Sequence, residues 1–169
     1  MTTFRVLGID PGSRVTGVGV VEAEGQHLRH VYSGCIRVGE GGLDFRLARI
    51  YQGVQEVIEA TTPREAALEQ IFMASNPRAA LVLGHARGSA FLAVVHRELE
   101  VTEYSALEIK RAVVGTGNAA KRQVQHMVRV LLGLEQTPTT DAADALACAI
   151  CHIHTAQVRN RLPLQERAR

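Results

Sequence analysis

The sequence predicts an α/β domain in which a mixed, five-stranded sheet carries helices on both faces. Three observations support this class. The chain has 169 residues, the size of one ordinary domain. Three strand-like segments come first, close enough together to be joined by hairpins. Helical and strand-like patterns then alternate, as they do where crossover helices join parallel strands.

The predicted strands are short apolar runs bounded by turn signals. They cover Phe4–Asp10, Val15–Val21, His27–Val38, Ala66–Ile71 and Glu100–Tyr104. The predicted helices have apolar residues at helical spacing, and several begin at a capping residue. They cover Leu43–Ala60, Asn76–Glu98, Ser105–Val114, Asn118–Leu134 and a last helix from Thr139 or Thr140 to Gln157. We therefore expect one domain over residues 1–157 and a basic, flexible C-terminal tail over residues 158–169.

Composition excludes several classes of protein. Hydrophobic residues make up 46% and charged residues 21%, which argues against a disordered chain. The sequence has no apolar run near the roughly 18 residues that span a bilayer, and its first residues lack the pattern of a secretory signal. Three cysteines are too few for a disulfide scaffold. A cytoplasmic location is the resulting expectation.

Charge is distributed unevenly, although the net charge is only +2. No acid occurs between Gln70 and Arg97 or between Ile109 and Leu134. The second window holds both lysines of the chain, Lys110 and Lys121. Such segregation favours a polyanionic partner such as DNA, although solvated helix faces would produce the same pattern. We expect Arg78 in the first window and Arg122 in the second to contact DNA.

Two carboxylates occur in predicted strands, one at the end of a strand and one within a strand. Asp10 follows an apolar strand and begins an Asp-Pro-Gly turn, so it is either a turn cap or a site residue. Glu69 interrupts an apolar strand, where an ionised group is costly unless it faces solvent, pairs with a cation or binds a metal. These two positions are candidates for a site at the edge of the sheet.

Asp141 and Asp144 begin the last predicted helix, among small and apolar residues. A spacing of three places both on one helix face, although acids in a first turn are also favoured by the helix dipole. Carboxylates without a histidine partner suit hard divalent cations, so we expect Mg²⁺, with Mn²⁺ able to substitute. Two such ions about 3.5–4 Å apart are a recurring device for phosphodiester hydrolysis.

The motifs together resemble the RuvC-type Holliday junction endonucleases (crossover junction endodeoxyribonucleases). The matching stretches are GIDPGSRVTGVGV, EQIFMASNPRAALVLGHARG, VVGTGNAAKRQVQHMV and DAADALACAI, in order and spread over nearly the whole chain except the tail. The resemblance implies a ribonuclease H-like fold, a homodimer, Mg²⁺ dependence with two ions per site, and resolution of four-way DNA junctions in recombination and repair. It also implies the branch-migration proteins RuvA and RuvB as partners.

The resemblance carries over to individual residues by motif position. It implies that the catalytic and metal-binding carboxylates are Asp10, Glu69, Asp141 and Asp144. It places Lys110 and Lys121 against phosphates, and Phe72 at the centre of the junction. Phe72 could instead be an ordinary core residue, and Gly84 and Gly88 could serve either helix packing on the sheet or a dimer contact.

Cys148, Cys151 and His152 form a pattern that is also found at haem attachment sites, and His154 could add a zinc ligand. Their apolar neighbours instead predict cysteines that behave as small buried hydrophobes. Two alternatives to a nuclease remain open at this point: a junction-binding scaffold without catalysis, and a nucleotide-binding domain of the actin-like or sugar-kinase type. The second requires two such domains, which 169 residues do not supply.

Overall fold

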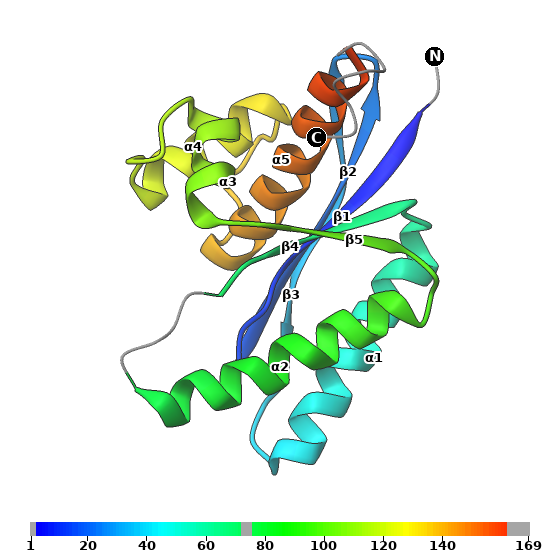
Figure 1. The fold of residues 1–169 in the computed structure, drawn as a ribbon, viewed down its shortest axis with the longest axis vertical. Helices are drawn as coiled ribbons and strands as arrows, with labels where there is room; N and C mark the ends of the chain where they lie inside the picture. Colours follow the sequence, from blue (N-terminus) through cyan, green and yellow to red (C-terminus); the bar gives the residue numbers. More distant parts are fainter. Residues whose placement is uncertain (1–2, 72–75, 162–169) are drawn as a thin grey trace.

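The protein is built on one five-stranded sheet with the strand order β3-β2-β1-β4-β5. The computed structural model describes residues 3–71 and 76–161. Its strands are β1 (Phe4–Asp10), β2 (Val15–Glu24), β3 (His27–Arg37), β4 (Glu65–Glu69) and β5 (Glu100–Tyr104). The first three form an antiparallel meander, and β1, β4 and β5 run parallel. The expected mixed sheet is confirmed (Figure 1).

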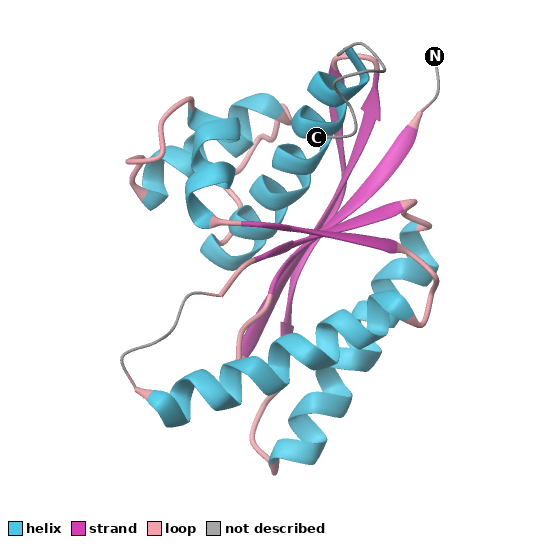
Figure 2. Ribbon diagram, in the orientation of Figure 1, coloured by secondary structure: helices cyan, strands magenta, loops and turns pink. Residues whose placement is uncertain are grey.

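Helices cover both faces of the sheet, as Figure 2 shows. They are α1 (Leu43–Thr61), α2 (Pro77–Val95), α3 (Ala106–Val114), α4 (Lys121–Leu131) and α5 (Thr140–Arg161). Side chains alternate along β1, so that Leu7 and Ile9 pack in the core under α1 and α2, whereas Val6 packs in the core under α3, α4 and α5. Each face of the sheet therefore has its own hydrophobic core.

Local sequence signals explain where two of the helices begin. The side chain of Asn76 accepts a hydrogen bond from the backbone N–H of Arg78 at 3.0 Å, and Pro77 occupies the first helical position. Ser105 and Glu108 form a capping box at the start of α3. Both caps confirm the sequence-based prediction.

Some predicted boundaries differ from the observed ones. β4 begins and ends earlier than predicted, at Glu65 and Glu69, so that Ile71 lies beyond the strand. α5 continues to Arg161, four residues past the predicted end. Residues 158–161 contain no residue that breaks a helix. The first helix-breaking residue is Pro163, two positions after Arg161.

Glycines in β1 and β2 let α5 lie unusually close to the sheet. A Cβ atom at Gly8 would lie 1.9 Å from the carbonyl oxygen of Ala145, and one at Gly17 would lie 2.0 Å from the carbonyl oxygen of Asp141. Real atoms cannot approach so closely, so only glycine fits at either position. The contact places the first turn of α5 directly against the end of β1.

α2 is the one helix of the described residues that is long and apolar enough, by length and composition alone, to cross a membrane. It packs as a fold element. Ala86, Ala90 and Ala93 are buried in the core beneath α1 and α2, and Arg87 pairs with Glu103 of β5 at 2.9 Å. Its apolar character belongs partly to this packing and partly to an exposed face.

Replacing Gly8 by alanine tests the close approach of α5. We expect Gly8→Ala to destabilise the protein by roughly 3 kcal/mol, because overpacking against a helix backbone is relieved only by moving the helix. For a chain of this size the melting temperature should fall by about 6–12 °C. Glu40→Ala is the control, since it changes an exposed residue in the loop between β3 and α1, and it should stay within about 1 kcal/mol of the parent. Equal melting temperatures for the two variants would contradict the proposed contact.

Candidate active site

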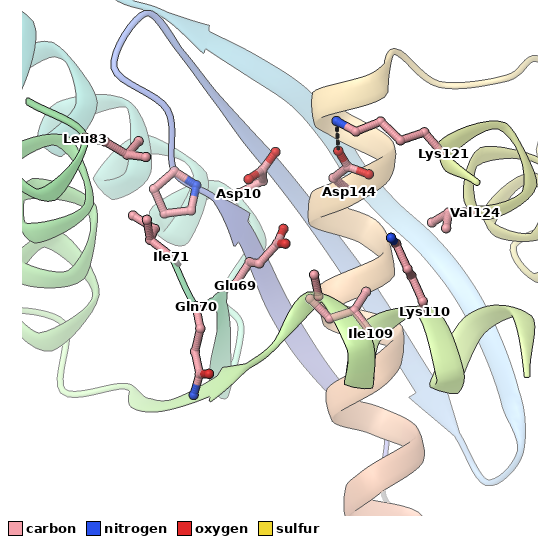
Figure 3. A pocket seen from close by; sticks show the side chains of 12 residues that line it. Asp10, Glu69, Gln70, Ile71, Leu83, Ile109, Lys110, Lys121, Val124 and Asp144 are labelled. Atoms are coloured by element: carbon pink, nitrogen blue, oxygen red, sulfur yellow. Dashed lines mark ion pairs between the residues drawn. The ribbon is translucent and has the colours of Figure 1, made fainter. Parts of the chain in front are cut away.

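Asp10 and Glu69 lie side by side at one edge of the sheet. They end β1 and β4, two neighbouring parallel strands in which Ile9 pairs with Leu68, so the next residues on each strand are adjacent. Ile9 and Leu68 face the core beneath α1 and α2, and the residue after each faces α5. Figure 3 shows both carboxylates turned toward the helix that carries Asp144.

Asp141 and Asp144 enter the same region from the first turns of α5. Gly17 pairs with Asp10 across β1 and β2, and the missing side chain of Gly17 makes room for the backbone of Asp141. The glycine thus brings the helix acids over the strand acids. The four predicted carboxylates lie close enough to interact electrostatically, since the charges of Glu69, Asp141 and Asp144 each raise the pKa of Asp10.

Two lysines stand on the opposite side of this group. Lys121 is the first residue of α4, and its Nζ atom lies 3.7 Å from Oδ2 of Asp144. Lys110 belongs to α3 and is only partly exposed. Both ammonium groups act to lower the pKa values of Glu69 and Asp144. The positive charges therefore face the same space as the carboxylates.

This space is a cleft of about 350 Å³ between α2, α3, α4 and α5. Asp10, Glu69, Asp144, Lys110 and Lys121 supply its charged lining. The remaining lining residues are Pro11, Gln70, Ile71, Leu83, Ala106, Ile109 and Val124. Apolar walls around charged groups lower the local dielectric constant and so strengthen the interactions among those groups.

Burial raises the pKa of Asp10 from its ordinary value of 3.8 to about 7. The charges of the other three carboxylates add to the rise, and Lys121 opposes it. Burial also raises the pKa values of Glu69 and Asp144. Partly desolvated carboxylates crowded together are unfavourable in their charged forms, and a bound cation relieves this cost.

The donor set fits a hard divalent cation, because its oxygen ligands are carboxylates and no histidine or cysteine lines the cleft. Among the described residues, no three acidic, histidine or cysteine side chains converge closely enough to hold an ion by themselves. The four carboxylates are therefore near neighbours in an open arrangement rather than a closed cage.

The structure separates some predicted residues from the cleft. Asp141 acts on it electrostatically but does not line it. Arg78 at the start of α2 and Arg122 on α4 are exposed, and neither lines the cleft. Phe72 lies outside the described residues, so its expected role stays a prediction.

Sequence reasoning missed several lining residues. Gln70 and Ile71 directly follow Glu69, so their position after a site-bearing strand was a usable signal. Leu83 reaches the cleft only through the packing of α2, which has no local signature. Cys148 and Cys151 are buried and free, as predicted, and burial raises the pKa values of both thiols.

Comparison with known proteins agrees with this geometry. The family model described as crossover junction endodeoxyribonuclease RuvC matches residues 6–152. A protein of that name from Francisella philomiragia is 55% identical over 157 residues, covering 93% of this chain and 92% of its own length. Another from Hahella chejuensis is 56% identical over 159 residues, covering 94% of this chain and 92% of its own length.

A solved structure has the same architecture. The structure of Thermus thermophilus RuvC in complex with a Holliday junction substrate superposes with a TM-score of 0.87 at 33% identity, and the match covers 92% of this chain and 96% of that one. The five-stranded mixed sheet is accordingly the ribonuclease H-like fold of these neighbours. With the family model matching most of its length, the chain belongs to the crossover junction endodeoxyribonuclease RuvC family.

Proposed function

We propose that this chain is an endonuclease that resolves four-way DNA junctions in recombination and repair by Mg²⁺-dependent phosphodiester hydrolysis. The observation that carries the proposal is the cleft in which carboxylates from β1, β4 and α5 face two lysines. The carboxylates suit the metal and the lysines suit the phosphate. The direct test is incubation with a synthetic four-way junction, with and without Mg²⁺, followed by mapping of the cut strands.

Asp10, Glu69, Asp141 and Asp144 would hold the metal, with Mn²⁺ able to replace Mg²⁺ and two ions per site. When bound, such ions lower the pKa of an attacking water and stabilise negative charge on the phosphate. Lys110 and Lys121 bind the phosphodiester from the other wall of the cleft. Because Lys121 also pairs with Asp144, an arriving phosphate and the carboxylate compete for one ammonium group.

The two alternatives account for less of the site. A scaffold without catalysis leaves unexplained why desolvated carboxylates with raised pKa values are gathered in a cleft, at a cost to stability. A nucleotide-binding domain of the actin-like or sugar-kinase type is not favoured, because the crossover junction endodeoxyribonuclease family model matches residues 6–152. Cleavage of a junction separates the enzyme from the scaffold, and ATP turnover would identify the kinase-like activity.

A homodimer fits the surface of α2. The exposed face of this helix carries mainly apolar and small residues at helical spacing, namely Leu81, Gly84, Gly88, Leu92 and Val95, together with His85. Leu81 is 64% exposed, and Cβ atoms at Gly84 and Gly88 would meet nothing within 4 Å. Packing on the sheet therefore does not require these two glycines, whereas close approach of a second helix would use both. A two-fold dimer also supplies the two sites that paired nicks require.

We propose DNA contacts by Arg78 and Arg122, two exposed basic residues outside the cleft. The family resemblance further supports a DNA contact by Phe72 and assembly with the branch-migration proteins RuvA and RuvB. A cytoplasmic location follows from the same assignment.

Removing one carboxylate tests the metal site. We expect Asp144→Asn to reduce junction cleavage by at least roughly 100-fold, because it removes a metal ligand. Junction binding should be unchanged or tighter, since a negative charge near the phosphate is lost. Asp44→Asn, which changes an exposed acid in the first turn of α1, should cleave like the parent. Normal cleavage by pure Asp144→Asn would remove this residue from the site.

The raised pKa of Asp10 predicts an unusual dependence of stability on pH. Its folded value of about 7 exceeds the ordinary value of 3.8, so the folded protein binds this proton more tightly than the unfolded chain. Without metal, the melting temperature should therefore rise as the pH falls from 8 to 6. Mg²⁺ should raise it at pH 8, and at subsaturating Mg²⁺ cleavage should increase as the pH rises through about 7. Asp10→Asn should lose much of this pH dependence, and an identical pH profile in that variant would contradict the assignment.

A charge on the exposed face of α2 tests the dimer. At micromolar concentration the parent should sediment at about twice 18.4 kDa, and Leu81→Glu should shift it toward the monomer because a carboxylate would be buried in the contact. Val158→Glu, which alters an equally exposed apolar residue on α5, should remain a dimer. The monomeric variant should cut one strand of a junction at a time and should not make paired cuts in two opposed strands. A dimer that survives Leu81→Glu would place the contact elsewhere.

A further inference from the structure

A buried chain of polar side chains crosses the core between the sheet and α5. Nε2 of His152 lies 2.7 Å from Oε2 of Glu65, and Nδ1 of His152 lies 3.0 Å from the hydroxyl of Tyr104. His152 is only 4% exposed and Tyr104 only 6%. A carboxylate can only accept a hydrogen bond, so Nε2 of His152 donates to Glu65. The hydroxyl of Tyr104 shares a second hydrogen bond with Nδ1.

Packing of the hydrophobic core does not by itself require this series of hydrogen-bonded polar side chains. His152 belongs to a stretch of α5 that is otherwise apolar, between Cys151 and Ile153. Burying polar groups is costly unless every partner is present, and apolar side chains of similar volume would fill such a place at no greater cost. A satisfied polar chain instead imposes one geometry on the elements that it joins.

We infer that His152 is a positioning residue, whose hydrogen bond to Glu65 holds α5 at one height along β4 and so keeps Asp144 opposite Glu69. The inference rests on the proposed function, in which these two carboxylates hold the metal. His152 touches neither substrate nor metal and acts only through the helix that it shares with Asp144.

Element dimensions support this role. His152 follows Asp144 by eight residues on α5, a rise of about 12 Å. Glu65 precedes Glu69 by four residues on β4, a span of about 13 Å. α5 starts at the end of the sheet where β4 finishes, so the two run in opposite directions. With His152 bonded to Glu65, Asp144 on α5 and Glu69 on β4 come to nearly the same height along the strand.

His152 ties α5 directly to β4, whereas the glycine contacts act on β1 and β2. Gly8 and Gly17 position the helix on β1 and β2, and hence against Asp10. Within residues 3–71 and 76–159, the bond between His152 and Glu65 is the one side-chain hydrogen bond that joins α5 to β4. Tyr104 adds a further tie, because it pairs with Glu69 across β4 and β5. These side chains thus connect α5 to β4 through Glu65 and to β5 through Tyr104.

Two substitutions at His152 separate positioning from general stability. The amide nitrogen of glutamine reaches the place of Nε2, so His152→Gln keeps a donor to Glu65. Asparagine reaches only the place of Nδ1, so His152→Asn loses that donor. Both lose the imidazole ring, and both leave a polar group in the core. His154→Gln is the matched control, because His154 lies two residues further along α5 and bonds the backbone of Ala112 in α3 rather than β4.

The measurements are the Mg²⁺ concentration for half-maximal cleavage, the Mg²⁺ concentration that raises the melting temperature half-maximally, and junction affinity in EDTA. In His152→Asn both metal concentrations should rise about 10-fold to 100-fold, the usual effect of losing a group that orients metal ligands. Junction affinity in EDTA should stay within twofold of the parent. His152→Gln should recover most of the metal response, and His154→Gln should match the parent.

The inference is overturned if His152→Asn and His152→Gln have equal metal responses, or if cleavage falls only in proportion to the folded fraction. Should His152→Asn fail to fold, Glu65→Ala replaces it, because the Glu65 side chain is 25% exposed and water can fill its place. Glu65→Ala should raise both metal concentrations in the same way, and a parental response in that variant overturns the inference. Failure of the parent to cleave with Mg²⁺ would instead count against the proposed function.

Discussion

The close contact between α5 and the glycines of β1 and β2 determines most of what the site can do. Asp141 and Asp144 are separated from Asp10 by more than 130 residues of chain, and they meet it only because Gly8 and Gly17 have no side chains where the helix backbone lies. A helix packed at an ordinary distance on larger side chains would hold its acids well above the end of β1. The close packing of backbones therefore brings the four carboxylates together, and the interactions between their charges follow from that packing.

That contact brings together groups that repel one another. Three carboxylates have raised pKa values through burial and mutual repulsion, while Lys110 and Lys121 offset part of the cost. An apolar site would be more stable. The arrangement makes sense where a cation and a phosphate are brought in, since the cation neutralises the acids and the phosphate takes over the lysines. The same raised pKa values that weaken the protein without metal make the site responsive to it.

The sequence was informative where a residue conflicts with its local surroundings. Asp10 could be identified because it is an acid at the end of an apolar strand, Glu69 because it interrupts a predicted apolar strand, and Asp144 because it lies among alanines. The order of the elements also followed from periodicity and caps. Contacts between distant segments could not be read in this way. The bond between His152 and Glu65 joins residues 87 positions apart, and no local pattern around His152 predicted that it would bond to a strand. Leu83 enters the cleft through the direction in which α2 crosses the sheet, which no local pattern encodes.

The two faces of the sheet have divided roles, and α2 connects them. The core beneath α3, α4 and α5 supports the carboxylates, whereas α1 and α2 cover the opposite face. Yet Leu83 of α2 lines the cleft, while Leu81 and Gly84 lie on the exposed face of the same helix. In the proposed dimer, each cleft would then lie about one helix width, roughly 10 Å, from the contact. In that dimer, a rigid helix shared by the contact and the cleft would fix how the two clefts face one junction, so that assembly and the geometry of paired cutting would depend on the same element.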